Sequence, residues 1–449
     1  MTDIASPSSP RALPALTDSA LLRYITFTLL YAAQGLPHGL LAIAIPAWMA
    51  EQGLGTAQIG VYLGVILLPW SLKLINGAVM DRFSFIPMGR RRPWVLSSQL
   101  GIVTSMASLM LIPDPLANYS LLTLAGFVIN LFTAFQDVAV DGMAIDVLPP
   151  GQQARANGFM WGGKTLGVSG GAAASGAVLG SFGLGLTGLF TGLVLGVVMM
   201  IPLLLRERPG ERLLPWSEGE PSESARIMQL TNWRSIGGGL LEAFLLPTSL
   251  QMVAITFLFA VGYGMMDTVM PVLTVQELGW DDAEYSQIVA MAGLVAGIVG
   301  MVVGGTVVQF FGRIRLIVGA IIVMIAVTMG MGLISQMCQD QSVVIGYLVV
   351  YYVLYTIVTI AFLSTAMILC RKRVSATQFA LYMAILNLGN AAGAGLTGPL
   401  DSILSYEQLF FAISGFWALM LALLWMVDLS VHQERINRLD RNAPQTDRQ

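Results

Sequence analysis

Long apolar segments alternate with short polar ones along the whole chain. Each apolar segment has about 20 residues or more, the length that an α-helix needs to cross the hydrocarbon core of a membrane. Twelve such segments are predicted, near residues 21–48, 57–80, 94–112, 119–146, 152–179, 183–205, 248–275, 284–311, 314–336, 342–369, 373–400 and 406–428. The pattern therefore predicts an all-α integral membrane protein with twelve transmembrane helices.

Lys and Arg are confined to alternate loops. The connections without either residue are those near 49–56, 113–118, 180–182, 276–283, 337–341 and 401–405. The other loops and both terminal segments hold the basic residues, including five arginines between positions 206 and 234. Because positively charged loops stay on the cytoplasmic side of a membrane, we expect both termini in the cytoplasm.

The composition is typical of a membrane protein and reduces the number of possible partners and cofactors. Only 11% of the 449 residues are charged, against about 25% in a typical soluble domain. The net charge is −3 and no basic face is present, so a nucleic-acid partner is not expected. With two histidines, and with Cys338 and Cys370 at opposite ends of one segment, we expect no metal centre, cofactor or intrachain disulfide.

One long loop divides the predicted helices into six and six. It is polar at first and then amphipathic, and it lies between the sixth and seventh segments. The expected organisation is a cytoplasmic tail, a six-helix bundle, an inter-bundle loop, a second six-helix bundle and a second cytoplasmic tail, at residues 1–20, 21–205, 206–247, 248–428 and 429–449.

Charge is concentrated in the loop "MDRFSFIPMGRRRPW", residues 80–94, between the second and third segments. Here the spacing is Gly77-x-x-x-Asp81-Arg82, followed by Gly89-Arg90-Arg91. The equivalent place in the second half reads "GTVVQFFGRIR" and contains Gly305, Gly312 and Arg313. A weak repeat at corresponding positions is typical of a transporter built from duplicated bundles.

This loop resembles the signature of the major facilitator superfamily, Gly-x-x-x-Asp-Arg/Lys-x-Gly-Arg-Arg/Lys, with an insertion at 84–88. The resemblance implies a fold of two pseudo-symmetric six-helix bundles and a cytoplasmic gate held by charge pairing. The candidate gate residues are Gly77, Asp81, Arg82, Gly89, Arg90, Arg91, Asp146, Gly305, Gly312 and Arg313. The alternative is a positively charged membrane anchor, which explains the arginines but neither Asp81 nor the spaced glycines.

Two further stretches resemble the AmpG-like branch, the peptide, acetyl-coenzyme A and drug transporter family. They are "FQDVAVDGMAIDVLPP" (135–150) and "SATQFALYMAI" (375–385), one in each half. The resemblance implies a secondary transporter of the bacterial inner membrane that imports cell-wall muropeptide fragments (anhydro-muramyl peptides) together with protons. Siderophores or other small peptide-like solutes, and acetyl-coenzyme A or drug-like molecules, remain alternative substrates.

Several charged residues lie inside the predicted helices. Each costs about 2.5–3.5 kcal/mol to insert at the bilayer centre, so such residues are functional candidates. Asp137 and Asp141 are four residues apart and share a helical face, where they could carry a proton while Lys73 or Lys164 binds an anionic group. A static ion-pair network is the alternative. The candidate substrate and proton-coupling residues are Lys73, Asp137, Asp141, Lys164, Gln136, Gln378, Asp267, His38, Tyr351 and Tyr355.

Packing explains some of these residues equally well. His38 could titrate near neutral pH or serve as a hydrogen-bonded core histidine, and Tyr351 and Tyr355 could stack on a sugar or on neighbouring helices. Gly163, Gly167 and Gly171 recur every four residues and predict a close helix contact on which the two halves could rock.

No catalytic set is present in the sequence, so an enzyme is not expected. A membrane-embedded enzyme, or a sensor that has lost transport, is the alternative class. The expected partners are a small solute, protons and the lipid bilayer, and the protein is expected to function as a monomer.

Overall fold

The computed structural model describes residues 14–52, 54, 56–229, 232–280, 282–334, 340–401 and 403–442. Within these ranges the regular elements are helices, apart from one isolated β-bridge between Ala15 and Arg206. The predicted all-α membrane fold is confirmed. Cys338 lies outside the described residues, and Cys370 is a buried free thiol.

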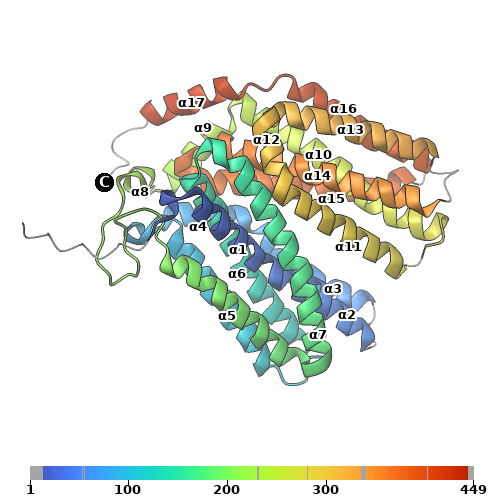
Figure 1. Ribbon diagram of the computed structural model, residues 1–449, viewed down its shortest axis with the longest axis horizontal. Helices are drawn as coiled ribbons and strands as arrows, with labels where there is room; N and C mark the ends of the chain where they lie inside the picture. Colours follow the sequence, from blue (N-terminus) through green and yellow to red (C-terminus); the bar gives the residue numbers. More distant parts are fainter. Residues whose placement is uncertain are drawn as a thin grey trace, which may run out of the picture.

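The first half of the chain forms a group of long helices, which we call the first bundle (Figure 1). Its helices are α1 (Ala20–Gly39), α2 (Ile45–Glu51), α3 (Thr56–Ser71), α4 (Lys73–Arg82), α5 (Arg92–Ser108), α6 (Tyr119–Val147) and α7 (Pro150–Leu204). A π-helical turn, Leu40–Ala44, joins α1 to α2. The single residue Leu72 separates α3 from α4, so the second predicted segment is one crossing with a break in it.

Helix α7 contains the fifth and sixth predicted segments, 152–179 and 183–205, as two arms on either side of Gly183. It leaves helical geometry at Gly183, where φ is +76°, a value that favours glycine because it has no Cβ. The hydroxyl oxygens of Ser175 and Thr191, eight residues to either side, lie 3.4 Å apart, so the two arms run back along each other. The described residues therefore contain eleven candidate membrane helices rather than twelve separate ones. The predicted loop at 180–182 is reduced to this one bend.

The second half forms the second bundle, which lies beside the first (Figure 1). Its helices are α10 (Pro247–Val272), α11 (Asp282–Val299), α12 (Gly305–Phe311), α13 (Arg313–Ile334), α14 (Gln341–Leu369), α15 (Ser375–Asp401) and α16 (Tyr406–Leu424). Two short helices, α8 (Glu223–Met228) and α9 (Trp233–Phe244), lie in the inter-bundle segment, and α17 (Leu429–Asn442) follows the second bundle.

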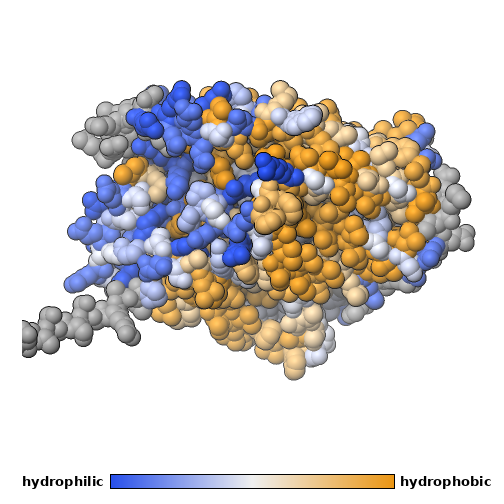
Figure 2. Space-filling view, turned by 45° about the horizontal axis from the view of Figure 1, so that its top comes forward, coloured by the Kyte–Doolittle hydropathy of each residue, from blue (hydrophilic) through white to orange (hydrophobic). Residues whose placement is uncertain are grey.

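Hydrophilic and hydrophobic residues separate along the long axis of the molecule. In Figure 2 the hydrophilic residues gather at the left end, and a broad hydrophobic surface covers the middle. Large apolar side chains such as Leu111, Met291 and Phe310 expose 78%, 67% and 83% of their surface. A continuous apolar surface of this kind is stable against lipid chains rather than water. We call the hydrophilic end, which holds Arg90–Arg92 and helices α8, α9 and α17, the arginine-rich end.

The two bundles touch closely between the arginine-rich end and the middle of the molecule. A Cβ added to Gly305 of α12 would lie 2.3 Å from the Cα atom of Arg155 in α7, and one added to Gly158 would lie 2.7 Å from the carbonyl oxygen of Gly300. Glycine is needed where backbones approach this closely. The predicted glycine stripe has another partner: Gly167 packs against Ala32 of α1, within the first bundle. It is therefore not a surface between the two halves.

Candidate functional site

The arginine-rich end contains a buried network centred on Asp81, at the end of α4. One carboxylate oxygen accepts hydrogen bonds from Arg90, at 3.0 Å, and from Arg91. The other accepts from Thr377 at the start of α15, at 3.0 Å from the backbone N–H and 2.6 Å from the hydroxyl. Asp81 therefore joins the first bundle to the second.

Asp146, near the end of α6, is the second carboxylate of this network. It lies 3.3 Å from Nη1 of Arg90 and 3.3 Å from Nε of Arg91, and it accepts a 3.0 Å hydrogen bond from Ser375. None of the four paired side chains has exposed surface. Burial disfavours the charged guanidinium of Arg91, but Asp81 and Asp146 outweigh burial and raise its pKa above the ordinary value.

Further contacts of the network cross between the bundles. Arg90 donates to the backbone carbonyls of Lys372 and Arg373 in the α14–α15 turn. Gly77 lies one turn before Asp81, and a Cβ there would be 2.9 Å from the carbonyl oxygen of Ala376. A lipid-facing anchor needs exposed guanidinium groups, whereas Arg90 is completely buried. We call Asp81, Arg90, Arg91, Asp146, Ser375 and Thr377 the gate network.

The remaining predicted gate residues lie around this network. Gly89 has a φ of +98° and ends the short 3₁₀ turn Ile86–Met88, which the insertion forms. Arg82 covers the ring of Phe83 at 4.9 Å instead of joining the network.

The second-half repeat contacts the start of α7. Arg313 donates to the carbonyl of Pro150 at 2.6 Å, after Gly312 with a φ of +80°. The repeat therefore contacts the first bundle through a backbone carbonyl. The first-half loop contacts the second bundle both through backbone carbonyls, which accept from Arg90, and through the Asp81 carboxylate.

Two acidic residues after α7, which the sequence did not single out, hold the arginine segment in place. Glu207 accepts hydrogen bonds from the backbone N–H groups of Arg91 and Arg92, at 2.9 and 3.2 Å. Glu211 accepts from the backbone N–H of Arg208 at 2.9 Å. Burial, and then the neighbouring Glu207, raise the pKa of Glu211 to about 7. The alternating charges of "RERPGER" (206–212) were the available signal.

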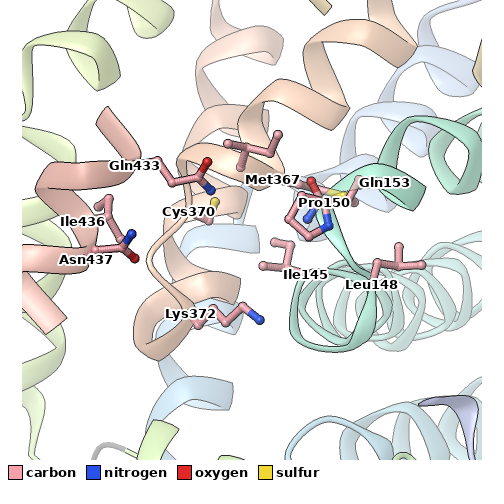
Figure 3. A pocket seen from close by; sticks show the side chains of 11 residues that line it. Ile145, Leu148, Pro150, Gln153, Met367, Cys370, Lys372, Gln433, Ile436 and Asn437 are labelled. Atoms are coloured by element: carbon pink, nitrogen blue, oxygen red, sulfur yellow. The ribbon is translucent and has the colours of Figure 1, made fainter. Parts of the chain in front are cut away.

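Helix α17 closes a small cavity beside the gate network (Figure 3). The cavity holds about 140 Å³. Figure 3 shows Gln433 and Asn437 of α17 on one side and Gln153 of α7 on the other, with Cys370 between them. The lining therefore comes from both bundles and from α17, and His432 of α17 lies 3.1 Å from the carbonyl of Leu369.

A second group of buried charges lies at the middle of the first bundle. Lys73 of α4 is 2.5 Å from one oxygen of Asp137 in α6, and Lys164 of α7 is 4.0 Å from the other. One turn further along α6, Asp141 accepts a hydrogen bond from the hydroxyl of Tyr31 in α1. We call Tyr31, Lys73, Asp137, Asp141 and Lys164 the central cluster.

The central cluster borders a large cavity between the bundles. The cavity holds about 880 Å³. Its first-bundle lining includes both lysines, and its second-bundle lining comes from α15. The polar and aromatic residues of the lining are His38, Trp70, Ser71, Lys73, Lys164 and Asn387. The structure thus brings two cations to a cavity that both bundles line.

Three other candidates lie apart from the central cluster. Gln136 donates to the carbonyl of Leu30 at 3.3 Å, within the first bundle. Gln378 accepts from the N–H of Arg371 at 2.8 Å and donates to the carbonyl of Leu369 at 3.1 Å, so it orders the α14–α15 turn. Asp267 is an exposed residue of α10 in the second bundle.

Tyr351 and Tyr355 of α14 belong to an aromatic stack inside the second bundle. Tyr355 stacks on Tyr263 with a centroid distance of 4.2 Å, and buried Tyr351 stacks on Trp417 at 6.2 Å. Neither tyrosine lines the large cavity. Helix packing therefore accounts for the contacts that the structure gives these two side chains.

Two cations beside a cavity that both bundles line, with a buried charge network between the bundles at one end of the molecule, fit a membrane transporter. The family model of the Major Facilitator Superfamily matches residues 27–394. The chain belongs to this superfamily and is a multi-pass membrane transporter.

Individual proteins are similar to this chain either in sequence or in fold. The anhydromuropeptide permease of Escherichia coli (strain K12) is 26% identical over 384 residues, covering 85% of this chain and 73% of the permease. Among solved structures, FucP in the outward conformation superposes with a TM-score of 0.67 at 10% identity, covering 91% of this chain and 99% of FucP. The human organic anion transporter MFSD10 gives a TM-score of 0.63 at 16% identity, covering 90% and 98%. These two structures show the fold alone.

Proposed function

We propose that this protein imports anhydromuropeptide-like solutes by alternating access, and that protons drive the import. The observation that carries the proposal is the pair of ammonium groups on the wall of the 880 Å³ cavity. The similarity to an anhydromuropeptide permease over 85% of the chain supports this class of solute. Peptide fragments bear carboxylates, which ammonium groups bind.

The conformation fits the first step of import. The gate network closes the arginine-rich end, so solute would enter the cavity from the opposite end. Because arginine-rich loops stay in the cytoplasm, we place this end and both termini on the cytoplasmic side of a bacterial inner membrane. The structure then corresponds to an outward-facing state, in which the cavity is separated from the cytoplasm by Asp81 and its partners.

The charges of the central cluster suggest how a proton could be coupled to the solute. Asp137 lies between two ammonium groups, which stabilise it as an anion. Asp141 has the neutral hydroxyl of Tyr31 as its partner and is the carboxyl that can accept a proton. With both carboxylates ionised, the charges of the cluster cancel. A proton on Asp141 leaves one net positive charge, which attracts an acidic solute into the cavity.

Uptake into proteoliposomes tests the proposal. Labelled anhydromuropeptide is supplied outside, with and without an inward proton gradient, to wild type and to Lys164→Gln. Arg234→Gln, which removes a positive charge from an exposed residue of α9, is the matched control. We expect accumulation with wild type and the control only when the gradient is present, and a strongly reduced rate with Lys164→Gln.

Two results would contradict the proposal. Absence of wild-type uptake would exclude this solute, and siderophores and coenzyme A esters would then be supplied to the same vesicles. Uptake that ignores the gradient would exclude proton coupling.

A further inference from the structure

The indole of Trp70 lies against both ammonium groups of the central cluster. Nζ of Lys73 is 4.6 Å from the centre of the ring, and Nζ of Lys164 is 5.1 Å from it. Both distances are within the range at which a cation is attracted by the electrons of an aromatic face. Trp70 also lines the 880 Å³ cavity, so this contact lies at the cavity wall.

The position of the indole is fixed by the first bundle. Its N–H donates to the side-chain oxygen of Asn130 in α6 at 3.3 Å, and the amide group of Asn130 donates to the carbonyl of Ile66 in α3 at 2.8 Å. Asn130 is almost completely buried. The break at Leu72 between α3 and α4 leaves Trp70 and Lys73 three residues apart on either side of it. The indole ring is therefore fixed by α3 and α6 before any solute enters the cavity.

The two lysines are not equivalent. Lys73 is 2.5 Å from Asp137 and its side chain is 10% exposed, whereas Lys164 is 4.0 Å from Asp137 and 28% exposed. Lys164 is thus the cation with room for a second anion. Asp137 attracts both ammonium groups, and the electron-rich indole face adds to that attraction.

We propose that Trp70 is a positioning residue that holds the Lys164 ammonium at the cavity wall, where it binds a carboxylate of the transported solute. This inference rests on the proposed function and narrows the class of solute. The site selects solutes whose acidic group lies next to Lys164. Without the indole, Lys164 gains freedom to move toward Asp137 or into the cavity. The acidic solute then loses its pre-organised partner and binds more weakly.

The test compares two solutes in wild type, Trp70→Leu and Trp70→Phe. One solute is a labelled anhydromuropeptide and the other is the same molecule with its carboxylates amidated. We expect Trp70→Leu to raise the KM of the acidic solute by about tenfold, as the loss of a desolvated cation–aromatic contact implies, with kcat little changed. Phenylalanine keeps an aromatic face and should restore part of the affinity. The preference for the acidic solute should disappear in Trp70→Leu.

Two controls separate positioning from a structural role. Trp425→Leu removes a tryptophan that is 93% exposed and should behave as wild type. In the double variant Trp70→Leu/Lys164→Gln, the loss should not exceed that of Lys164→Gln alone, because both changes remove the same interaction.

Three outcomes would overturn the inference. The first is a wild-type KM for the acidic solute in Trp70→Leu. The second is an equal loss for the acidic and amidated solutes, which indicates a structural role. The third is a fully additive double variant. Absence of any wild-type uptake is a separate result, because it contradicts the proposed function and removes the solute on which this inference rests.

Discussion

The gate network and the central cluster are both buried groups of paired charges, but they connect different parts of the chain. In the gate network, Asp81 and Asp146 of the first bundle contact Thr377 and Ser375 of the second. In the central cluster, Lys73, Lys164 and Tyr31 pair with Asp137 or Asp141, and all of these residues belong to the first bundle. One group therefore breaks when the bundles separate at the arginine-rich end, and the other stays assembled.

This difference assigns two separate tasks to buried charge. In the proposed mechanism, a network that spans both bundles stabilises one orientation of the transporter, and its strength sets the balance between the two orientations. In the proposed mechanism, a cluster within one bundle can keep its proton and its solute while the bundles move. Substitutions in the gate network and in the central cluster should therefore have different effects on the protein.

The largest effect is expected at Asp81. Replacement by Asn removes the negative charge that pairs with Arg90 and Arg91, and breaking a buried ion pair costs roughly 3–5 kcal/mol. The substitution destabilises the conformation in which the arginine-rich end is closed. We therefore expect the arginine-rich end to open. In a Cys338→Ser background, Cys370 would then react with a maleimide much faster than in the parent, because its cavity is enclosed by both bundles.

Glu218→Gln, at an exposed position, is the control for Asp81→Asn. Unchanged reactivity of Cys370 in Asp81→Asn would show that the gate network does not hold this end closed.

Asp137→Asn should instead reduce the stability of the first bundle. Both central lysines form ion pairs with Asp137, so buried Lys73 and half-buried Lys164 lose a counter-charge. We expect a lower Tm in detergent, by an amount that reflects the same roughly 3–5 kcal/mol. The double variant Lys73→Gln/Asp137→Asn should recover part of the loss, because one uncompensated cation is removed. A Tm equal to that of wild type would contradict the pairing.

Gly305→Ala tests the close contact between the bundles with a smaller perturbation. The added Cβ would lie 2.3 Å from the Cα atom of Arg155, and overpacking of this kind costs about 1–3 kcal/mol. The closed arginine-rich end should again be disfavoured, and labelling of Cys370 should rise moderately. Gly293→Ala in α11 is the matched control, since nothing lies within 4 Å of its added Cβ. Equal labelling in the two variants would argue against the contact.

The smallest effect concerns Glu211 and depends on pH. Its pKa is raised from 4.5 to about 7 by burial and by Glu207, so the folded segment binds the proton more tightly than the unfolded one. The stability of the folded segment should therefore fall as the pH rises from about 4.5 to about 7. Glu211→Gln keeps an acceptor without the charge and should remove this dependence.

Hydrogen-exchange protection of the Arg91 and Arg92 amides, which donate to Glu207, measures this effect. We expect wild type to lose protection between pH 5.5 and pH 8, and Glu211→Gln to keep it. Equal protection of wild type at both pH values would be inconsistent with the raised pKa.

The sequence predicts helices and buried charges well, because both follow from local patterns. Apolar length fixes the membrane helices, and the spacing of Asp137 and Asp141 places them on one face of α6. The partners of these charges do not follow from local patterns, because Lys73 and Asp137 are 64 positions apart and Asp81 and Thr377 are 296 apart. No local pattern specifies which distant residues meet, so the ion pairs had to come from the structure.

Other features were missed for similar reasons. Trp70 and Tyr31 look like ordinary aromatic residues of apolar segments, and only their partners distinguish them. Gln378 lies in a family-like motif, yet it orders a turn through the backbone of Leu369 and Arg371. Gly183 lies in an apolar, glycine-rich stretch whose composition does not show how tightly the two arms of α7 are joined.

The most direct test of proton coupling is the proton movement that the solute evokes in wild type and in Asp141→Asn. Proteoliposomes with an internal pH indicator receive anhydromuropeptide in the absence of any imposed gradient. We expect internal acidification with wild type and none with Asp141→Asn, while Asp141→Asn still exchanges labelled for unlabelled solute. Acidification in Asp141→Asn at the wild-type rate would contradict the assignment of the proton to Asp141 and, with it, the coupling mechanism proposed for the central cluster.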